Sequence, residues 1–286
     1  MKMKNQTFGV EIELTGITRK KASQIIADYF GTENFYIGTY YETYGAKDSK
    51  GRTWKAMHDG SIRQENGQAV EIVTPILKYD DIEDLQEIVR QLRHNGAKAN
   101  ETCGIHIHIG AEKHTANTLA NLVNIMTSKQ NLIYKALDIK TSREHYCKKL
   151  KPELADKIRK NKPDSLEKMA DIWYDGYDRD RTAHYNNSRY HCLNLHSVFT
   201  KGTVEFRLFN STTHAGKIKA YIQLCLAINN QALTQKSATA RITETTNPKY
   251  TFRTWLLRLG LIGDEFKTAR LHLLANLDGN TAWRNG

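Results

Sequence analysis

Hydrophobic and polar residues alternate in several short segments of the chain. In residues 7–15 every second position is hydrophobic, and Glu11 and Glu13 fall between these positions. A strand points successive side chains to opposite faces, so this pattern predicts a half-buried strand with both glutamates on its polar face. Further strands are expected at residues 36–44, 53–57, 69–74, 103–110, 190–198 and 203–209.

Other segments carry hydrophobic residues at helical spacing. In residues 79–94 these are Ile82, Leu85, Ile88, Val89 and Leu92, which predicts an amphipathic helix. Helices are also expected at residues 18–30, 115–137, 214–233 and 252–277, and in the basic region after residue 139. Hairpins around residues 46–51 and 200–202, flanked by these helices, predict an α+β fold with helices packed on one face of an antiparallel sheet.

Length and composition favour one cytoplasmic catalytic domain. The 286 residues contain no internal repeat and no Gly/Ser-rich linker, so we expect a single domain over residues 1–286. No apolar run is long enough for a membrane span, and the first residues show no signal-peptide pattern. The four cysteines are far apart without CxxC spacing, which disfavours a zinc knuckle or a disulfide framework. We expect them to be core residues or inert thiols.

Positive charge is concentrated in one part of the sequence. The chain has 42 Lys+Arg against 31 Asp+Glu, a net charge of +11, and residues 139–162 carry nine bases against three acids, or +6. This segment either attracts a polyanion such as a nucleic acid or a nucleotide, or forms a solvated helix face. Both interpretations remain open at this point.

The polar faces of the strands carry the residues that are suited to chemistry. Members of a pair two positions apart point from the same face, and the set comprises Glu11 with Glu13, Glu71, His106 with His108, and Glu205 with Arg207. If the strands are neighbours, the carboxylates repel one another and divalent cations would relieve the repulsion. Mostly oxygen ligands with one or two nitrogens favour magnesium or manganese over zinc. An arginine beside them would face a transferring phosphoryl group.

Five motifs, in this order, resemble those of the amidoligase family of the carboxylate–amine ligase superfamily, which is related to glutamine synthetase and glutamate–cysteine ligase. They are FGVEIEL at residues 8–14, DGSI at 59–62, EIVTPIL at 71–77, CGIHIHI at 103–109 and GTVEFRLFN at 202–210. Residues 193–195 and 282–283 are also similar to that family. The resemblance therefore spans roughly residues 7–285.

The resemblance implies a curved, mostly antiparallel sheet that forms an open cleft, with helices on the outer face. ATP and two or three Mg²⁺ or Mn²⁺ ions would lie on the concave side. By their positions in the motifs, the metal ligands would be Glu11, Glu13, Glu71, His106 and Glu205. Arg207 would match the phosphate-binding arginine.

The resemblance also implies ATP-dependent amide formation. A carboxylate would attack the γ-phosphate to give an acyl phosphate, and an amine would then displace the phosphate. Asp59 and Ser61 would lie near the incoming amine or carboxylate, with Asp59 accepting the proton, and His108 would contact substrate or nucleotide or ligate a metal.

The substrates would be small or peptide carboxylates and amines, or ones carried by a polyanion. A basic helical insert is expected at about residues 139–180, and its basic segment at residues 139–162 is the expected specificity element. Three more residues are candidates for substrate or nucleotide contacts from their own positions. Arg189 lies just before the strand expected at residues 190–198 and Asn194 lies within it, although an Asn in a loop more often forms a turn. Trp54 either stacks on adenine or is an ordinary strand aromatic.

Three other functions compete with a ligase. The HxH pair with carboxylates also suits a zinc or iron metalloenzyme. The positive charge suits a nucleic-acid-binding protein on a ligase-like fold. A phosphotransferase that stops at the phosphorylated product is the third alternative.

Overall fold

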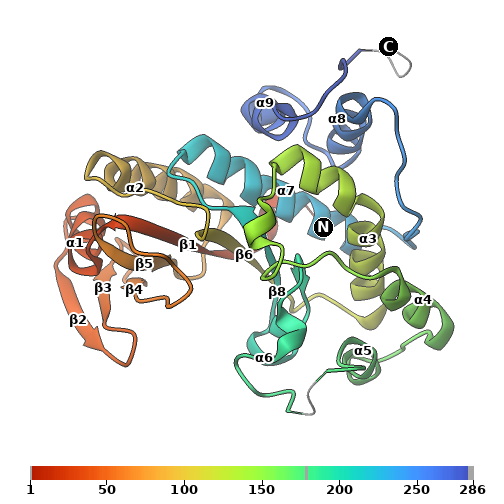
Figure 1. Ribbon diagram of the computed structural model, residues 1–286, viewed down its shortest axis with the longest axis horizontal. Helices are drawn as coiled ribbons and strands as arrows, with labels where there is room; N and C mark the ends of the chain where they lie inside the picture. Colours follow the sequence, from red (N-terminus) through yellow and green to blue (C-terminus); the bar gives the residue numbers. More distant parts are fainter. Residues whose placement is uncertain (1, 178–179, 283–286) are drawn as a thin grey trace. The chain divides into compact units, whose positions relative to one another are not determined.

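The computed structural model describes residues 2–177 and 180–282. Eight strands form one open antiparallel sheet in the order β2-β3-β4-β5-β1-β6-β8-β7, with helices between them in the sequence (Figure 1). The predicted α+β class is therefore confirmed. No helix in these two ranges is long and apolar enough to cross a membrane.

The chain divides into two compact units. The N-terminal unit comprises Thr7–Ile107 and Phe209–Lys219, and the C-terminal unit comprises Met1–Gln6, His108–Leu208 and Ala220–Gly286. Strand β6 (Gly104–Gly110) contributes residues to both units. The expectation of one catalytic domain with a basic insert stays a prediction, and positions 178 and 179 of that insert lie outside the described residues.

The N-terminal unit is built on β1 (Phe8–Ile17), whose hydrophobic side chains are buried as the alternation predicts. The other elements of this unit are α1 (Arg19–Phe30), β2 (Asn34–Gly38), β3 (Thr43–Lys47), β4 (Thr53–Met57), β5 (Gln68–Val73) and α2 (Ile82–His94). Helix α1 begins after Thr18, whose side chain accepts a hydrogen bond from the Lys21 N–H. It packs against β3 and β4 (Figure 1).

One predicted strand of this unit is wrong. Residues 36–44 do not form a single strand, because Gly38, Thr39 and Glu42 adopt positive φ values of 83°, 73° and 45° and reverse the chain between β2 and β3. The expected hairpin therefore joins β3 to β4. Its turn is closed by Asp48, whose carboxylate accepts hydrogen bonds from the backbone of Lys50 and Arg52.

The C-terminal unit contains most of the helices. Its elements are α3 (Ala116–Leu137), α4 (Pro152–Asn161), α5 (Leu166–Trp173), β7 (Leu193–Asn194), α6 (His196–Lys201), α8 (Pro248–Arg258) and α9 (Lys267–Leu274). Strand β8 (Thr203–Asn210) and helix α7 (Ala215–Thr234) lie mostly in this unit. Short 3-10 turns occur at Met3–Asn5, Tyr79–Asp81, Thr141–Arg143, Asn187–Arg189 and Asp264–Phe266.

Two predicted elements of this unit need correction. The strand expected at residues 190–198 is reduced to β7, because the Asn194 side chain accepts a hydrogen bond from the His196 N–H and the chain turns into α6. The helix expected at residues 252–277 is divided into α8 and α9. Gly260 and Gly263 interrupt it with φ values of 87° and 83°.

Candidate functional site

Strands β1, β5 and β6 hold an acidic cluster in the N-terminal unit, made of Glu11, Glu13, Glu71 and His106. Glu13 and Glu71 are directly opposite each other in the β1/β5 register. Glu13, Glu71 and His106 each offer a ligand atom, and these atoms all lie within 4.8 Å of one another. Like charges directly opposite on a sheet repel, so this pairing is favourable only with positive charge close by.

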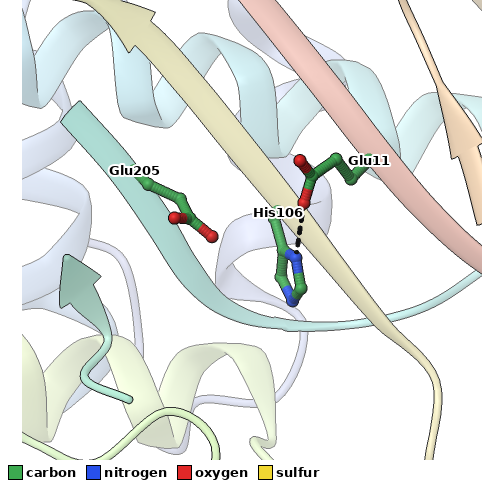
Figure 2. Close-up of side chains that lie close together, drawn as sticks. All are labelled: Glu11, His106 and Glu205. Carbon is green, nitrogen blue, oxygen red and sulfur yellow. Dashed lines mark hydrogen bonds and ion pairs between the residues drawn. The ribbon is translucent and has the colours of Figure 1, made fainter. Parts of the chain in front are cut away.

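Glu13 and His106 are held by specific contacts. Glu13 is 4% exposed, and its carboxylate accepts a hydrogen bond of 2.5 Å from the Gly104 N–H. Its other oxygen lies 3.5 Å from Nε2 of His106. Nδ1 of His106 lies 2.9 Å from the Glu11 carboxylate, and Figure 2 shows these two side chains turned toward each other. The third side chain labelled there, Glu205, belongs to β8.

This arrangement fits a divalent cation. A neutral imidazole has one N–H; if Nδ1–H donates to Glu11, the lone pair of Nε2 points toward the Glu13 carboxylate. Two negative or electron-rich groups then face each other, and a cation between them would remove the conflict. A carboxylate that orients a ligating histidine in this way is common at metal sites. Two carboxylates and one imidazole are a donor set that suits Mg²⁺ or Mn²⁺.

Strands β7 and β8 hold a second cluster, in the C-terminal unit, around Glu205. Its side chain is 2% exposed and forms an ion pair with Arg207, which is itself buried. Asn194 lies opposite Glu205 in the β7/β8 register and donates a hydrogen bond of 2.7 Å to its carboxylate. The partners of the buried Glu205 carboxylate thus include a cation, Arg207, and an amide, Asn194.

His108 belongs to the Glu205 cluster. Its Nδ1 lies 3.0 Å from the Thr203 hydroxyl, and its Nε2 lies 3.9 Å from the Glu205 carboxylate. His106 and His108 are two positions apart on β6, so they point from the same face of that strand, as the sequence predicts.

Comparison with known protein families agrees with the family resemblance of the sequence motifs. A sequence model of the family described as "Putative amidoligase enzyme" matches residues 4–229. The chain belongs to the amidoligase family. A search of curated proteins gave no match. The family match ends before residues 282–283, and Trp283 lies outside the described residues.

Two candidate positions of this amidoligase, Trp54 and Arg189, have contacts outside the two clusters. Trp54 is fully buried in the core, where its ring packs 5.8 Å from that of Phe30 and its N–H donates to Asp48. The described structure gives it no surface on which adenine could stack. The Arg189 guanidinium lies over the rings of Tyr185 and Tyr190 and donates to the His184 carbonyl.

Asp59 and Ser61 of the amidoligase form a turn just after β4. The Asp59 carboxylate accepts hydrogen bonds of 2.7 and 2.6 Å from the Ser61 N–H and hydroxyl. Met57, the last residue of β4, is opposite Glu71 in the β4/β5 register. The turn therefore begins two residues after a position that is paired with the acidic cluster. Roles for Asp59, Ser61 and Arg189 in substrate binding stay predictions.

Sequence reasoning missed three residues that support the clusters. Gly104 donates its N–H to Glu13, and Thr203 holds His108. Thr203 is two positions before Glu205 on β8, so the same period-2 rule would have found it. Arg143 was counted only among the nine bases of residues 139–162, but it is 3% exposed and its guanidinium donates a hydrogen bond of 3.4 Å to the Arg207 carbonyl.

The four cysteines of the amidoligase lie in the core. All four cysteines are buried and unlinked, as expected for core residues, and burial raises the pKa of the Cys192 thiol to about 12.

Among the nine bases of residues 139–162, Lys140, Lys157 and Arg159 form ion pairs with aspartates. These pairs reduce the charge available to a polyanion, whose binding stays a prediction.

Proposed function

We propose that the protein is an ATP-dependent carboxylate–amine ligase that forms an amide or peptide-type bond. One observation carries the proposal: Glu13 and Glu71 face each other across β1 and β5 with His106 beside them, in a chain of the amidoligase family. A buried and a half-buried carboxylate with an imidazole beside them are suited to a divalent cation, and divalent cations accompany nucleotide phosphates in phosphoryl transfer.

In this proposal Glu13, Glu71 and His106 hold a cation, and Glu11 fixes the orientation of the imidazole. Glu205 is proposed as a further metal ligand, by its place in the family motif. The bound Mg²⁺ or Mn²⁺ ions would neutralise charge on the phosphates of ATP. The remaining roles fall to the protein's own side chains.

The proposed reaction has two steps. A substrate carboxylate attacks the γ-phosphorus of ATP, the bond to ADP breaks and an acyl phosphate forms. An amine then attacks the carbonyl carbon, inorganic phosphate leaves and the amine loses a proton. Arg207 would bind the transferring phosphoryl group and Asp59 would accept the proton, while Ser61, His108, Arg189 and Asn194 are proposed to help to position the substrates.

Isotope exchange tests the first step without knowledge of the amine. ATP labelled with ¹⁸O in the β,γ-bridge is incubated with Mg²⁺ and pools of carboxylates, and scrambling of the label into the β-nonbridging position is followed by ³¹P NMR. We expect scrambling with at least one pool in the wild type, and none with Glu13→Gln. The matched control is Glu87→Gln, which removes one charge from a half-exposed side chain on α2 of the same unit.

Metal replacement separates this proposal from its main competitor. After treatment with EDTA, we expect Mg²⁺ or Mn²⁺ to restore isotope scrambling. Recovery of a hydrolytic activity by zinc alone, with no scrambling in any pool, would reject the ligase and favour a zinc metalloenzyme. Transfer that ends at a stable phosphorylated product, even with amines present, would favour a phosphotransferase.

A further inference from the structure

A second candidate ligand site lies between α3 and α8 in the C-terminal unit. It is a cavity of about 830 Å³, and its wall includes Lys129, Thr243, Glu244, Trp255 and Arg258. We call it the Lys129 cavity. Apart from Lys129, these residues lie beyond position 229, where the family match ends.

Part of the wall of the Lys129 cavity is formed by the long connection between α7 and α8, which is hydrogen-bonded to α3. After α7 the chain runs without regular structure to Pro248, and side chains on α3 bond to its backbone carbonyls. The bonds are Asn121 to Gln235 (3.0 Å), Asn124 to Ala238 (3.0 Å) and Ser128 to Arg241 (2.6 Å). Residues 121, 124 and 128 follow helical spacing, so one face of α3 holds the whole connection in place.

Lys129 is a half-buried cation at this wall. Its ammonium group donates a hydrogen bond of 2.6 Å to the Thr243 hydroxyl and lies 5.9 Å from the ring centre of Trp255. Burial, together with the positive charge of Arg258, lowers the pKa of Lys129. Neither Lys129 nor Arg258 forms an ion pair with a described carboxylate, including Glu244 on the same wall.

A second hollow in the same unit gives the contrasting case. It has a volume of about 740 Å³, and Lys157, Lys168 and Arg181 belong to its lining. Each of these three cations is paired with an aspartate, namely Asp175, Asp164 and Asp171 respectively. The charge of that hollow is balanced by the protein, whereas Lys129 has a hydroxyl and an aromatic neighbour.

We infer that the Lys129 cavity binds a small organic anion, whose phosphate or carboxylate group contacts Lys129 and Arg258. An anion would balance the two cations and accept hydrogen bonds from them. The volume is in the range of small-molecule sites, so it accommodates more than an inorganic ion. Trp255 and Tyr250 on the wall offer aromatic surface for the apolar part of the ligand.

Calorimetric titration with four probes tests this inference. The probes are inorganic phosphate, phenyl phosphate, acetate and benzoate, which separate the two oxyanions and the contribution of an apolar ring. We expect saturable binding of at least one aromatic anion, and tighter binding than for its inorganic or methyl counterpart. The higher affinity of phenyl phosphate or of benzoate then identifies the oxyanion class.

Variants assign the binding to the Lys129 cavity. We expect Lys129→Met to weaken binding by about tenfold or more, since a hydrogen bond to a charged group contributes about 1.5–3 kcal/mol. Lys129→Arg should restore much of the affinity. Arg258→Gln, at an exposed side chain, should also weaken it. Lys135→Met is the matched control, because Lys135 is on the same helix but pairs with Asp278 outside the cavity.

Three results would overturn the inference. It fails if no aromatic anion binds the wild type saturably, or if Lys129→Met and Arg258→Gln bind as tightly as Lys135→Met. It also fails if Glu13→Gln, and not Lys129→Met, abolishes binding, because the anion would then belong to the acidic cluster. Thermal unfolding of each variant confirms that the comparison is made between folded proteins.

Discussion

The acidic cluster and the Glu205 cluster use the same residue type in different electrostatic surroundings. Glu13 is opposite another glutamate, and its carboxylate bonds to a backbone N–H and lies near an imidazole. Glu205 is opposite an asparagine and bonds to an arginine. The first arrangement gains from an added cation, whereas in the second a protein cation is already bonded to the carboxylate. Strand position alone does not show which of the glutamates is already paired with a cation of the protein.

Removal of charge from Glu13 should give the largest difference between the clusters. Glu13→Gln keeps an oxygen that can accept from the Gly104 N–H but removes the repulsion with Glu71. We expect the rate of ATP-dependent amide formation to fall by about 1,000-fold, because a metal ligand contributes several kcal/mol to charge stabilisation. The metal-free protein should be as stable as the wild type or slightly more stable.

Urea unfolding with and without Mg²⁺ measures the second part of this prediction. The Glu87→Gln control should keep both the activity and the stabilisation by metal. A metal-free Glu13→Gln protein that is less stable than the wild type by more than about 1 kcal/mol would show that repulsion does not dominate this cluster.

Removal of charge from Arg207 should have the opposite effect on stability. Arg207→Met leaves the buried Glu205 carboxylate without its arginine partner, so we expect the metal-free protein to lose about 3 kcal/mol of unfolding free energy. The same urea experiment checks it. Arg207→Lys, which retains the charge, should recover part of the stability. Equal stability of Arg207→Met and the wild type would contradict the contrast between the clusters.

Glu11 should have an intermediate effect. It orients His106 through Nδ1, so Glu11→Gln is expected to weaken metal binding by about 10- to 100-fold without abolishing it. Titration with Mn²⁺ measures the change. A loss as complete as in Glu13→Gln would make Glu11 a direct ligand instead of an orienting residue.

Trp54 should have the smallest effect on activity. Its ring is in the core, and Trp54→Phe removes only its hydrogen bond to Asp48 and part of its packing. We expect a stability loss of about 1 kcal/mol and an unchanged KM for ATP. A rise in this KM at unchanged stability would restore Trp54 as a nucleotide-stacking residue.

The sequence predicted the strands of the acidic cluster well because alternation is a local property. The hydrophobic positions of β1 determine that Glu11 and Glu13 share the other face. The turn between β2 and β3 was not predictable from composition, since Thr39 and Glu42 adopt positive φ values that such residues rarely take. Strand β7 is short because of a single side-chain hydrogen bond from Asn194, which competes with sheet pairing.

The partners of the site residues could not be predicted from local patterns. The opposition of Glu13 and Glu71 depends on the register between strands that are far apart in the sequence. The burial of Trp54 depends on α1, which brings Phe30 against it. Period-2 spacing therefore identified which side chains share a face, and tertiary contacts decided which of them meet.

Direct measurement of Mn²⁺ binding tests the central claim, that Glu13, Glu71 and His106 hold a divalent cation. The nucleotide-free wild type, Glu13→Gln and Glu87→Gln are titrated with Mn²⁺ and followed by water-proton relaxation. We expect the wild type and Glu87→Gln to bind at least one ion with the same Kd, and Glu13→Gln to bind it more than about 100-fold more weakly, beyond the effect of an orienting residue. Equal Mn²⁺ affinity in all three proteins would contradict the claim.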